Sequence, residues 1–136
     1  YFGEKDFQQL QIVKKLVQKL KMSITIIGCS IHREPNGLAM SSRNERLSES
    51  EKKEAAVIYK TLKQVKAKFK TESASAVTNW VSKTFDKIPN IKLEYFQIAD
   101  ENTLLPCLRK VENKKYRAFI AVFINNIRLI DTIALK

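Results

Sequence analysis

The N-terminal part of the chain combines a strand-like start, an amphipathic helix and a second apolar run. Apolar residues recur at helical spacing over about residues 6–20, with lysines on the opposite side. Residues 1–2 before this helix are typical of the end of a strand. Residues 24–27 form a short β-branched run that ends at Gly28, which favours a strand buried on both faces, as in parallel sheets. The pattern therefore predicts a βαβ unit.

The middle of the chain changes character twice. Residues 29–47 carry few periodic apolar side chains and contain a turn signal at Pro35-Asn36-Gly37. Ser48 and Glu51 then have the spacing of a capping box, which predicts the start of a helix. Two apolar series behind it predict helices over residues 55–69 and 77–85, the second ending before Pro89.

The C-terminal part has the pattern of an antiparallel sheet. Residues 93–99 are strand-like, and residues 117–124 and 127–133 predict two strands joined by a tight turn at Asn125-Asn126. The fold class that we predict is therefore α/β at the start, passing into α+β. We place a domain boundary near residues 44–47, which gives a first domain over 1–46 and a second over 47–136.

The composition excludes several classes of protein and site. Lys and Arg number 25 against 14 Asp and Glu, a net charge of +11, and apolar residues make up 44% of the 136 residues, as in a globular protein. The longest apolar run, residues 118–124, is too short to span a membrane. Two cysteines without a Cys-x-x-Cys motif and a single histidine rule out a disulfide scaffold and a Cys/His zinc site, so we expect no resident metal site.

The start of the chain also carries information. No signal peptide is visible, which predicts a cytoplasmic protein. The chain begins at Tyr1 in the middle of a pattern, so we expect it to be a piece of a longer protein.

The first candidate site is Gly3-Glu4-Lys5-Asp6, at the predicted turn from strand to helix. Ligands of open α/β sheets bind beyond the carboxyl ends of the strands, and the free N–H groups of a helix start suit phosphate. Gly3 allows a close approach to the backbone, Lys5 offers a positive charge, and Asp6 can accept sugar hydroxyls. The alternative is that Asp6 only caps the helix and Lys5 is a solvated surface charge.

The second candidate site is the loop over residues 37–44. Ser41, Ser42 and Arg43 form a compact set of phosphate-binding donors. The alternative is an interdomain linker whose arginine caps a helix. Both loops follow strands of one βαβ unit, and this shared location favours a functional site.

The basic clusters support a rival hypothesis, a nucleic-acid-binding α+β module. Lysines gather at residues 52–53, 66–70 and 114–115. On the helix from residue 49, however, they are interleaved with glutamates, and no aromatic-rich basic strand appears. His32 is alone in a loop, which disfavours a Ser–His–Asp or Cys–His mechanism.

Two motifs of the chain resemble the pantoate–β-alanine ligase family. They are Tyr1-Phe2-Gly3-Glu4-Lys5-Asp6-Phe7-Gln8-Gln9-Leu10 and Gly37-Leu38-Ala39-Met40-Ser41-Ser42-Arg43-Asn44, and the late Arg128-Leu129-Ile130-Asp131 is also similar to that family. The resemblance implies the C-terminal piece of a Rossmann-like ATP- and pantoate-binding domain, followed by a small α+β lid domain with an antiparallel sheet.

The resemblance also implies an AMP-forming reaction in two steps. Pantoate and ATP with Mg²⁺ give pantoyl adenylate, and β-alanine then gives pantothenate. Lys5 and Arg43 would be the catalytic residues and Gln9 would bind pantoate. The expected ATP-binding residues are Gly3, Glu4, Lys5, Asp6, His32, Met40, Ser41, Ser42 and Arg43. The resemblance further implies a homodimer at full length, with no specific nucleic acid partner and no membrane.

Two departures from the family pattern stand out. Ser30-Ile31-His32 lies where the family often has Pro-Thr before its Arg-Glu. The family's His-x-Gly-His motif is absent from this sequence. We expect that motif in an N-terminal half of the same enzyme, and we expect the present chain to be inactive without it.

Overall fold

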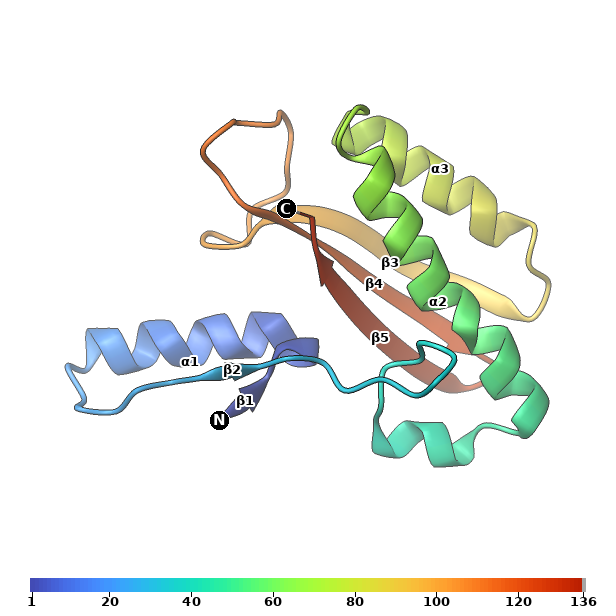
Figure 1. Cartoon of the computed structure of the whole chain (residues 1–136), viewed down its shortest axis with the longest axis horizontal. Coiled ribbons are helices and arrows are strands. Elements are labelled where there is room, and N and C mark those ends of the chain that lie inside the picture. The colour runs from blue at the N-terminus through green and yellow to red at the C-terminus, as the bar shows by residue number, and fades with distance from the viewer. Residues whose placement is uncertain (136) are drawn as a thin grey trace.

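The computed structural model describes residues 1–135, and in them the chain forms two separate sheets and three α-helices (Figure 1). The elements in chain order are β1 (Phe2–Gly3), the short 3₁₀ helix η1 (Glu4–Asp6), α1 (Phe7–Lys19), β2 (Gly28–Cys29), the 3₁₀ helix η2 (Ser42–Arg46), α2 (Glu49–Lys68), α3 (Ala74–Asp86), β3 (Ile91–Asp100), β4 (Tyr116–Ile124) and β5 (Ile127–Ala134). No helix among residues 1–135 is both long enough and apolar enough to cross a bilayer.

The N-terminal unit is the predicted βαβ arrangement, with a correction to its second strand. β1 and β2 pair in parallel through Phe2 with Gly28 and Gly3 with Cys29, and α1 connects them. The predicted strand over residues 24–27 is wrong. In the described residues, β2 pairs only with the two-residue β1, so the apolar run before Gly28 has almost no partner for its backbone. Its one bond to β1 is the Phe2 N–H donated to the Ile27 carbonyl at 2.9 Å.

The larger sheet has the order β3-β4-β5 and is antiparallel throughout, as the sequence predicts. α2 and α3 cover one face (Figure 1). All of β4 except Phe123 is buried. Ile120 and Val122 join the core under α2 and α3, whereas Phe119 turns to the opposite face. The central strand is therefore apolar on both faces, which explains its continuous apolar run.

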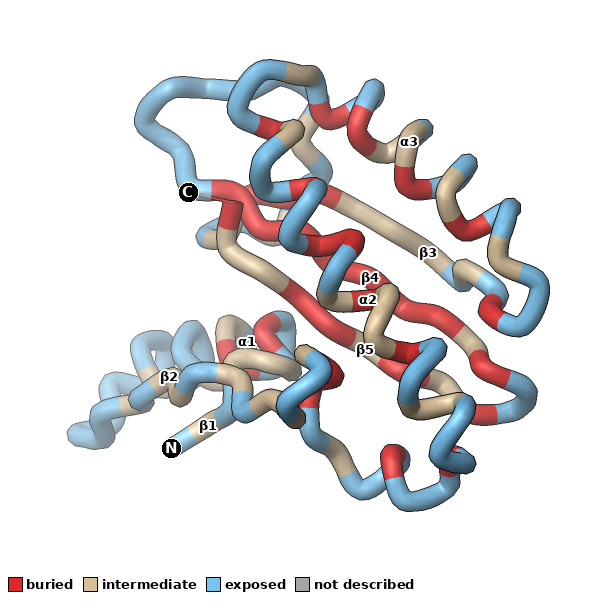
Figure 2. The backbone as a smooth tube through the Cα atoms, turned by 45° about the vertical axis from the view of Figure 1, so that its right-hand side comes forward, coloured by how far each residue is buried: buried red, intermediate tan, exposed pale blue. Residues whose placement is uncertain are grey.

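The start of α1 occupies the opposite face of this sheet (Figure 2). Phe7 and Leu10 are buried there in a small core with Phe119 and Ala99, and the rings of Phe7 and Phe119 lie 6.0 Å apart. The rest of α1 extends beyond the sheet, where Ile12, Leu16 and Leu20 are exposed. One turn of α1 therefore fixes the N-terminal unit to the sheet.

The capping box confirms the predicted start of α2. The Glu51 N–H donates to Ser48 Oγ at 3.2 Å, and the Ser48 N–H donates to Glu51 Oε1 at 2.8 Å. Leu38 and Leu47, which precede this helix, pack into the core under α2 and α3. The division into residues 1–46 and 47–136 stays a prediction, and this packing fastens the end of the first segment to the second.

We predict that residues 1–28 of this chain exchange their amide hydrogens faster than residues 117–131. The N-terminal sheet has two residues in each strand and α1 is held by one turn, whereas β4 is buried on both faces, so local opening costs less free energy in the N-terminal unit. Hydrogen exchange read by mass spectrometry tests this. Equally slow exchange in both segments of a demonstrated monomer would contradict it.

Candidate active site

The Gly3-Glu4-Lys5-Asp6 loop is held against the larger sheet by a buried arginine. Arg117 of β4 lies with its guanidinium 4.1 Å from the centre of the Phe7 ring. The same group contacts Glu101 at 3.2 Å and Glu4 at 3.8 Å. Because Glu4 turns toward Arg117, it fixes the loop, and the loop then presents Lys5 and Asp6 on its other side.

Gly3 has no structural need to be glycine in this chain. Its backbone is extended, with φ −72° and ψ 139°, and a Cβ built there would meet no atom within 4 Å. The backbone at Gly3 is therefore open to close approach by a ligand.

The second loop is anchored to β5 by Arg33. Its guanidinium donates to both oxygens of Asp131 at 2.6 and 2.9 Å, and to the Gly37 carbonyl at 3.1 Å. It also donates to the Thr132 carbonyl at 3.4 Å and lies over the ring of Tyr59, with 3.7 Å between Cζ and the ring centre. Gly37 adopts φ +94°, and a Cβ there would come within 2.6 Å of the Tyr59 ring, so this turn requires glycine.

Asn44 shapes the serine-containing part of this loop. Its buried amide donates to the Ala39 carbonyl at 3.0 Å and to Glu34 at 3.1 Å. It accepts a hydrogen bond from the Ser41 hydroxyl at 3.3 Å. Ser42 begins the short helix η2 and is exposed. The loop is thus built by its own side chains, and both serine residues lie at the start of η2.

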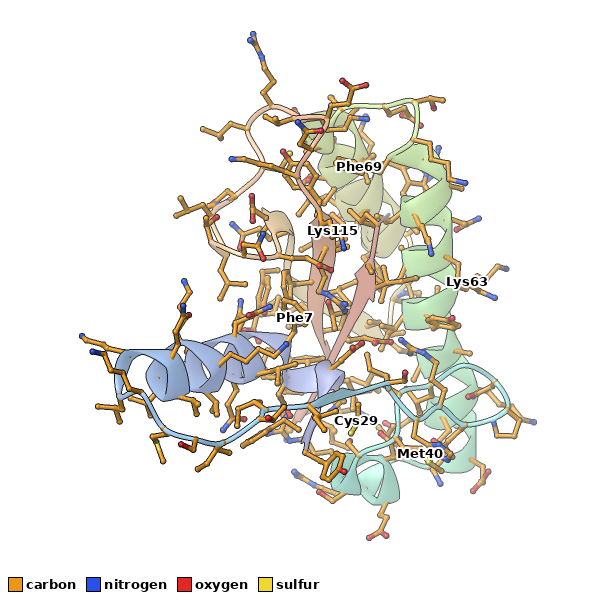
Figure 3. The ribbon with its side chains drawn as sticks, turned by 60° about the vertical axis from the view of Figure 1, so that its left-hand side comes forward. Phe7, Cys29, Met40, Lys63, Phe69 and Lys115 are labelled. Carbon is orange, nitrogen blue, oxygen red and sulfur yellow. The ribbon has the colours of Figure 1, made fainter. Side chains whose placement is uncertain are left out.

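His32 and Met40 lie side by side. The Met40 N–H donates to the His32 carbonyl at 2.9 Å, and both side chains are exposed. Figure 3 labels Met40 in the second loop and Cys29 at the end of β2, three residues before His32. The exposed pair therefore flanks the carboxyl end of β2, on the edge where open α/β sheets bind ligands.

A hollow of about 220 Å³ lies between the η1 turn and the sheet. Lys5, Asp6 and Gln9 line it from one side, and Arg128 and Asp131 line it from β5. The other residues of its wall are Phe7, Gln8, Tyr95, Phe119, Ile120 and Ile130. Three residues predicted from the sequence thus share one cavity, while Gly3, Glu4, His32, Met40, Ser41, Ser42 and Arg43 lie outside its wall.

Arg43 approaches this hollow from the second loop. Its guanidinium donates to the carbonyl of Arg128, a wall residue, at 3.4 Å. Lys5 is half-buried, and this burial lowers the pKa of its ammonium below the usual range. Asp6 acts in the opposite direction, whereas the positive charge of Arg43 lowers the pKa of Lys5 further. The two basic groups are therefore close enough to interact.

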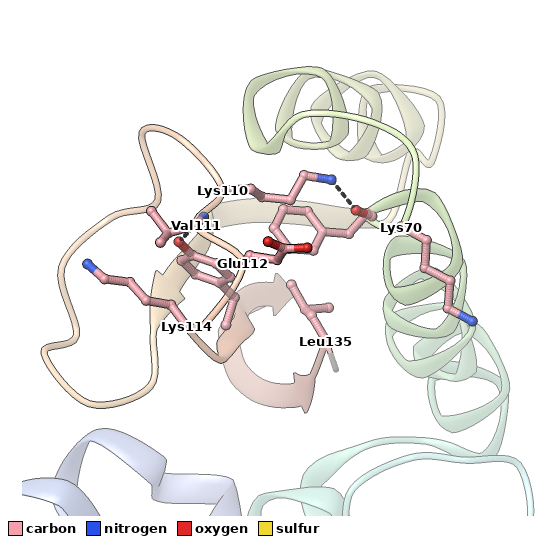
Figure 4. Close-up of a pocket in the computed structure, with 8 residues that line it drawn as sticks. Lys70, Lys110, Val111, Glu112, Lys114 and Leu135 are labelled. Atoms are coloured by element: carbon pink, nitrogen blue, oxygen red, sulfur yellow. Dashed lines mark hydrogen bonds between the residues drawn. The ribbon is translucent and has the colours of Figure 1, made fainter.

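A more apolar hollow of about 410 Å³ lies elsewhere, beyond the end of α2 (Figure 4). Phe69, Tyr116 and Leu135 supply its apolar surface. Lys110 crosses it with its ammonium donating to the Phe69 carbonyl. Lys70 and Lys114 of the basic clusters line it, but none of the residues of the two candidate loops does.

The sequence reasoning missed the supporting residues Arg33, Arg117 and Asn44. Each is polar, largely buried and bonded to a residue distant in sequence or to the loop backbone. The position of Arg33, two residues before the turn at 35–37, is the one local signal that could have indicated it.

Comparisons with known proteins identify the family of this chain. The family model described as pantoate-beta-alanine ligase matches residues 1–134. The chain belongs to that family. The pantothenate synthetase of Flavobacterium psychrophilum is 64% identical over 136 residues, and that of Bacteroides fragilis is 41% identical over 140 residues. The family and the α/β fold that the sequence resemblance implied are therefore confirmed.

Solved structures give the same result. The pantothenate synthetase of Thermus thermophilus matches 99% of the chain with a TM-score of 0.89 and 32% identity. The pantoate-beta-alanine ligase of Francisella tularensis, complexed with beta-gamma ATP and beta-alanine, matches with a TM-score of 0.65. The chain spans about half the length of these relatives, 48% of the Flavobacterium protein and 49% of the Thermus chain.

We predict that Arg43→Gln raises the pKa of Lys5. Removing a neighbouring positive charge stabilises the ammonium form, so less neutral amine is present at a given alkaline pH and acylation of Lys5 slows. The rate of Lys5 labelling by an amine-reactive ester, followed against pH by mass spectrometry, measures this. Lys15, exposed on α1, is the internal control in the same sample. An unchanged Lys5 profile would show that Arg43 does not act on Lys5.

Proposed function

We propose that this chain forms part of an ATP-dependent ligase that condenses pantoate with β-alanine through pantoyl adenylate. Family membership supports the reaction class. The observation that carries the proposal to this chain is the approach of Lys5 and Arg43, from two separate loops, to one hollow.

The two steps need charge stabilisation more than covalent help from the protein. In the first, a carboxylate oxygen of pantoate attacks the α-phosphorus of ATP and pyrophosphate leaves. In the second, the amine of β-alanine attacks the acyl carbon and AMP leaves. Lys5 and Arg43 stabilise the negative charge that builds on the phosphate oxygens, and Mg²⁺ enters with ATP as part of the substrate.

The remaining predicted residues surround this pair. Gly3 leaves its backbone open to the nucleoside, and Asp6 accepts from the ribose hydroxyls. Glu4 contributes through its contact with Arg117, which holds the loop. Gln9 lies in the wall of the hollow, where it binds pantoate.

The second loop supplies the other contacts. His32 lines the adenine pocket through its backbone, and Met40, bonded to that backbone, packs near the base. Ser41 and Ser42 add short donors to the phosphates beside Arg43. Asn44 supports this role because it fixes the shape of the loop.

We also propose how this chain fits into the intact enzyme. The N-terminal unit is the end of a Rossmann-like nucleotide-binding domain, and residues 47–136 form a lid over it. The other half of the enzyme supplies a His-x-Gly-His motif and the contacts of a homodimer, and the enzyme works in the cytoplasm. The parallel pairing of β1 with β2 and the separate three-stranded sheet support this division.

We predict that Lys5→Ala in the intact enzyme lowers kcat for adenylate formation by about 10²-fold, more than it raises KM for ATP. Loss of one charge-stabilising donor typically has an effect of that order, because the interaction is strongest in the transition state. Single-turnover pyrophosphate release with pantoate and ATP measures the rate. Arg43→Lys is more active than Arg43→Ala but less active than the wild type, since lysine keeps the charge and lacks the planar fork of arginine.

Lys15→Ala is the matched control, because it removes a lysine that is exposed on α1. It keeps the wild-type rate, and thermal melts show that all variants are folded. Wild-type pyrophosphate release by a folded Lys5→Ala enzyme would remove Lys5 from the catalytic residues.

A further inference from the structure

We infer that Arg33 is a positioning residue that holds Arg43 in place across from Lys5, an inference that rests on the proposed function. Arg33 contacts three different parts of the fold at once. It pairs with Asp131 on β5, stacks on Tyr59 of α2 and donates to the carbonyl of Gly37.

The geometry of the Arg33–Asp131 pair makes it a rigid connection. Two parallel N–H···O bonds of 2.6 and 2.9 Å fix the plane of the guanidinium as well as its position. The Asp131 side chain is only 2% exposed, and its Oδ1 also accepts the Thr132 N–H at 2.7 Å. Neither partner can rotate without breaking a bond.

The loop beyond Arg33 depends on this connection. The Glu34 N–H donates to the Leu38 carbonyl at 2.8 Å, and the Gly37 N–H donates back to Glu34 at 2.8 Å. Arg33 holds the Gly37 carbonyl of the same turn, while Leu38 enters the core under α2. The turn that starts the loop is therefore fixed from both sides, a few residues before Arg43.

Strand β5 holds the loop at two points. Arg43 donates to the carbonyl of Arg128, three residues before Asp131 on β5. The loop thus touches β5 twice, once through Arg33 and once through Arg43. Arg43 is exposed, and among residues 1–135 its side chain makes this one long hydrogen bond, so the Arg33 anchor sets where it points.

Arg33 lies outside the wall of the hollow, and Tyr59 covers one face of its guanidinium. Its role is therefore to place another residue and not to touch substrate. A small displacement of a charge-stabilising group can lower a rate by as much as about 10²-fold, so such a support affects the chemistry without contacting it.

The test is a double-mutant cycle in the intact enzyme between Arg33→Lys and Arg43→Ala, read by single-turnover pyrophosphate release. Arg33→Lys keeps the positive charge and loses the two-bond grip. We expect it to slow adenylate formation by about 10-fold or more, within the range for a misplaced group, with a smaller change in KM for ATP. In the Arg43→Ala background, Arg33→Lys adds less than about 2-fold, because the residue that it positions is gone.

Lys68→Met is the matched control. Lys68 also combines an ion pair, with Glu72 at 3.6 Å, and a cation–π contact, with Trp80 at 4.8 Å, but it lies at the far end of α2. We expect the Lys68→Met enzyme to keep the wild-type rate of pyrophosphate release. If Arg33→Lys melts below the assay temperature, Tyr59→Leu takes its place in the cycle, since this change removes the ring contact and leaves the ion pair.

The outcomes separate the inference from the proposed function. Equal effects of Arg33→Lys in both backgrounds, or no effect on the rate of a folded variant, would overturn the positioning role. A wild-type rate in the Arg43→Ala enzyme would instead overturn the proposed catalytic role of Arg43. A less than additive double variant supports both.

Discussion

The ion pair between Arg33 and Asp131 joins residues that are 98 positions apart and fixes the relation between the two parts of the chain. It adds a charged anchor to a segment that Leu38, Leu47 and Asn44 already hold by burial. Breaking a largely buried pair by removing one partner typically costs about 3–5 kcal/mol, because the other charge is left in a poorly solvated site. The buried charge pair thus helps to place the loop that carries Arg43, the arginine that we propose stabilises charge on the phosphates.

A second support acts on the opposite side of the site. Arg117 of the central strand β4 pairs with both Glu4 and Glu101, and its guanidinium lies over the Phe7 ring. It fixes the turn that presents Lys5, just as Arg33 fixes the loop that presents Arg43. Arg117 belongs to β4, and Arg33 pairs with Asp131 of β5, so the larger sheet is the common frame for both basic groups.

The local features of the fold could be predicted from the sequence, because they depend on neighbouring residues. The spacing of apolar residues located α1, α2 and α3, and the Ser48–Glu51 box located the start of α2. The strand predicted over residues 24–27 was wrong because a β-branched run forms a strand only where another strand offers backbone partners. The two candidate loops were recognisable from their glycine, serine and basic residues. Their shared location was expected from the βαβ pattern. The contacts that hold them, through Arg33 and Arg117, were not, because partners that are distant in sequence leave no periodic signal.

The joint role of Lys5 and Arg43 is tested most directly by a crystal structure of the intact enzyme with a non-hydrolysable ATP analogue and pantoate. The account predicts that the Lys5 ammonium and the Arg43 guanidinium both lie within hydrogen-bonding distance of phosphate oxygens, while Arg33 keeps both of its bonds to Asp131. Phosphates bound away from these two groups, or a nucleotide complex in which the Arg33–Asp131 pair is broken, would contradict it.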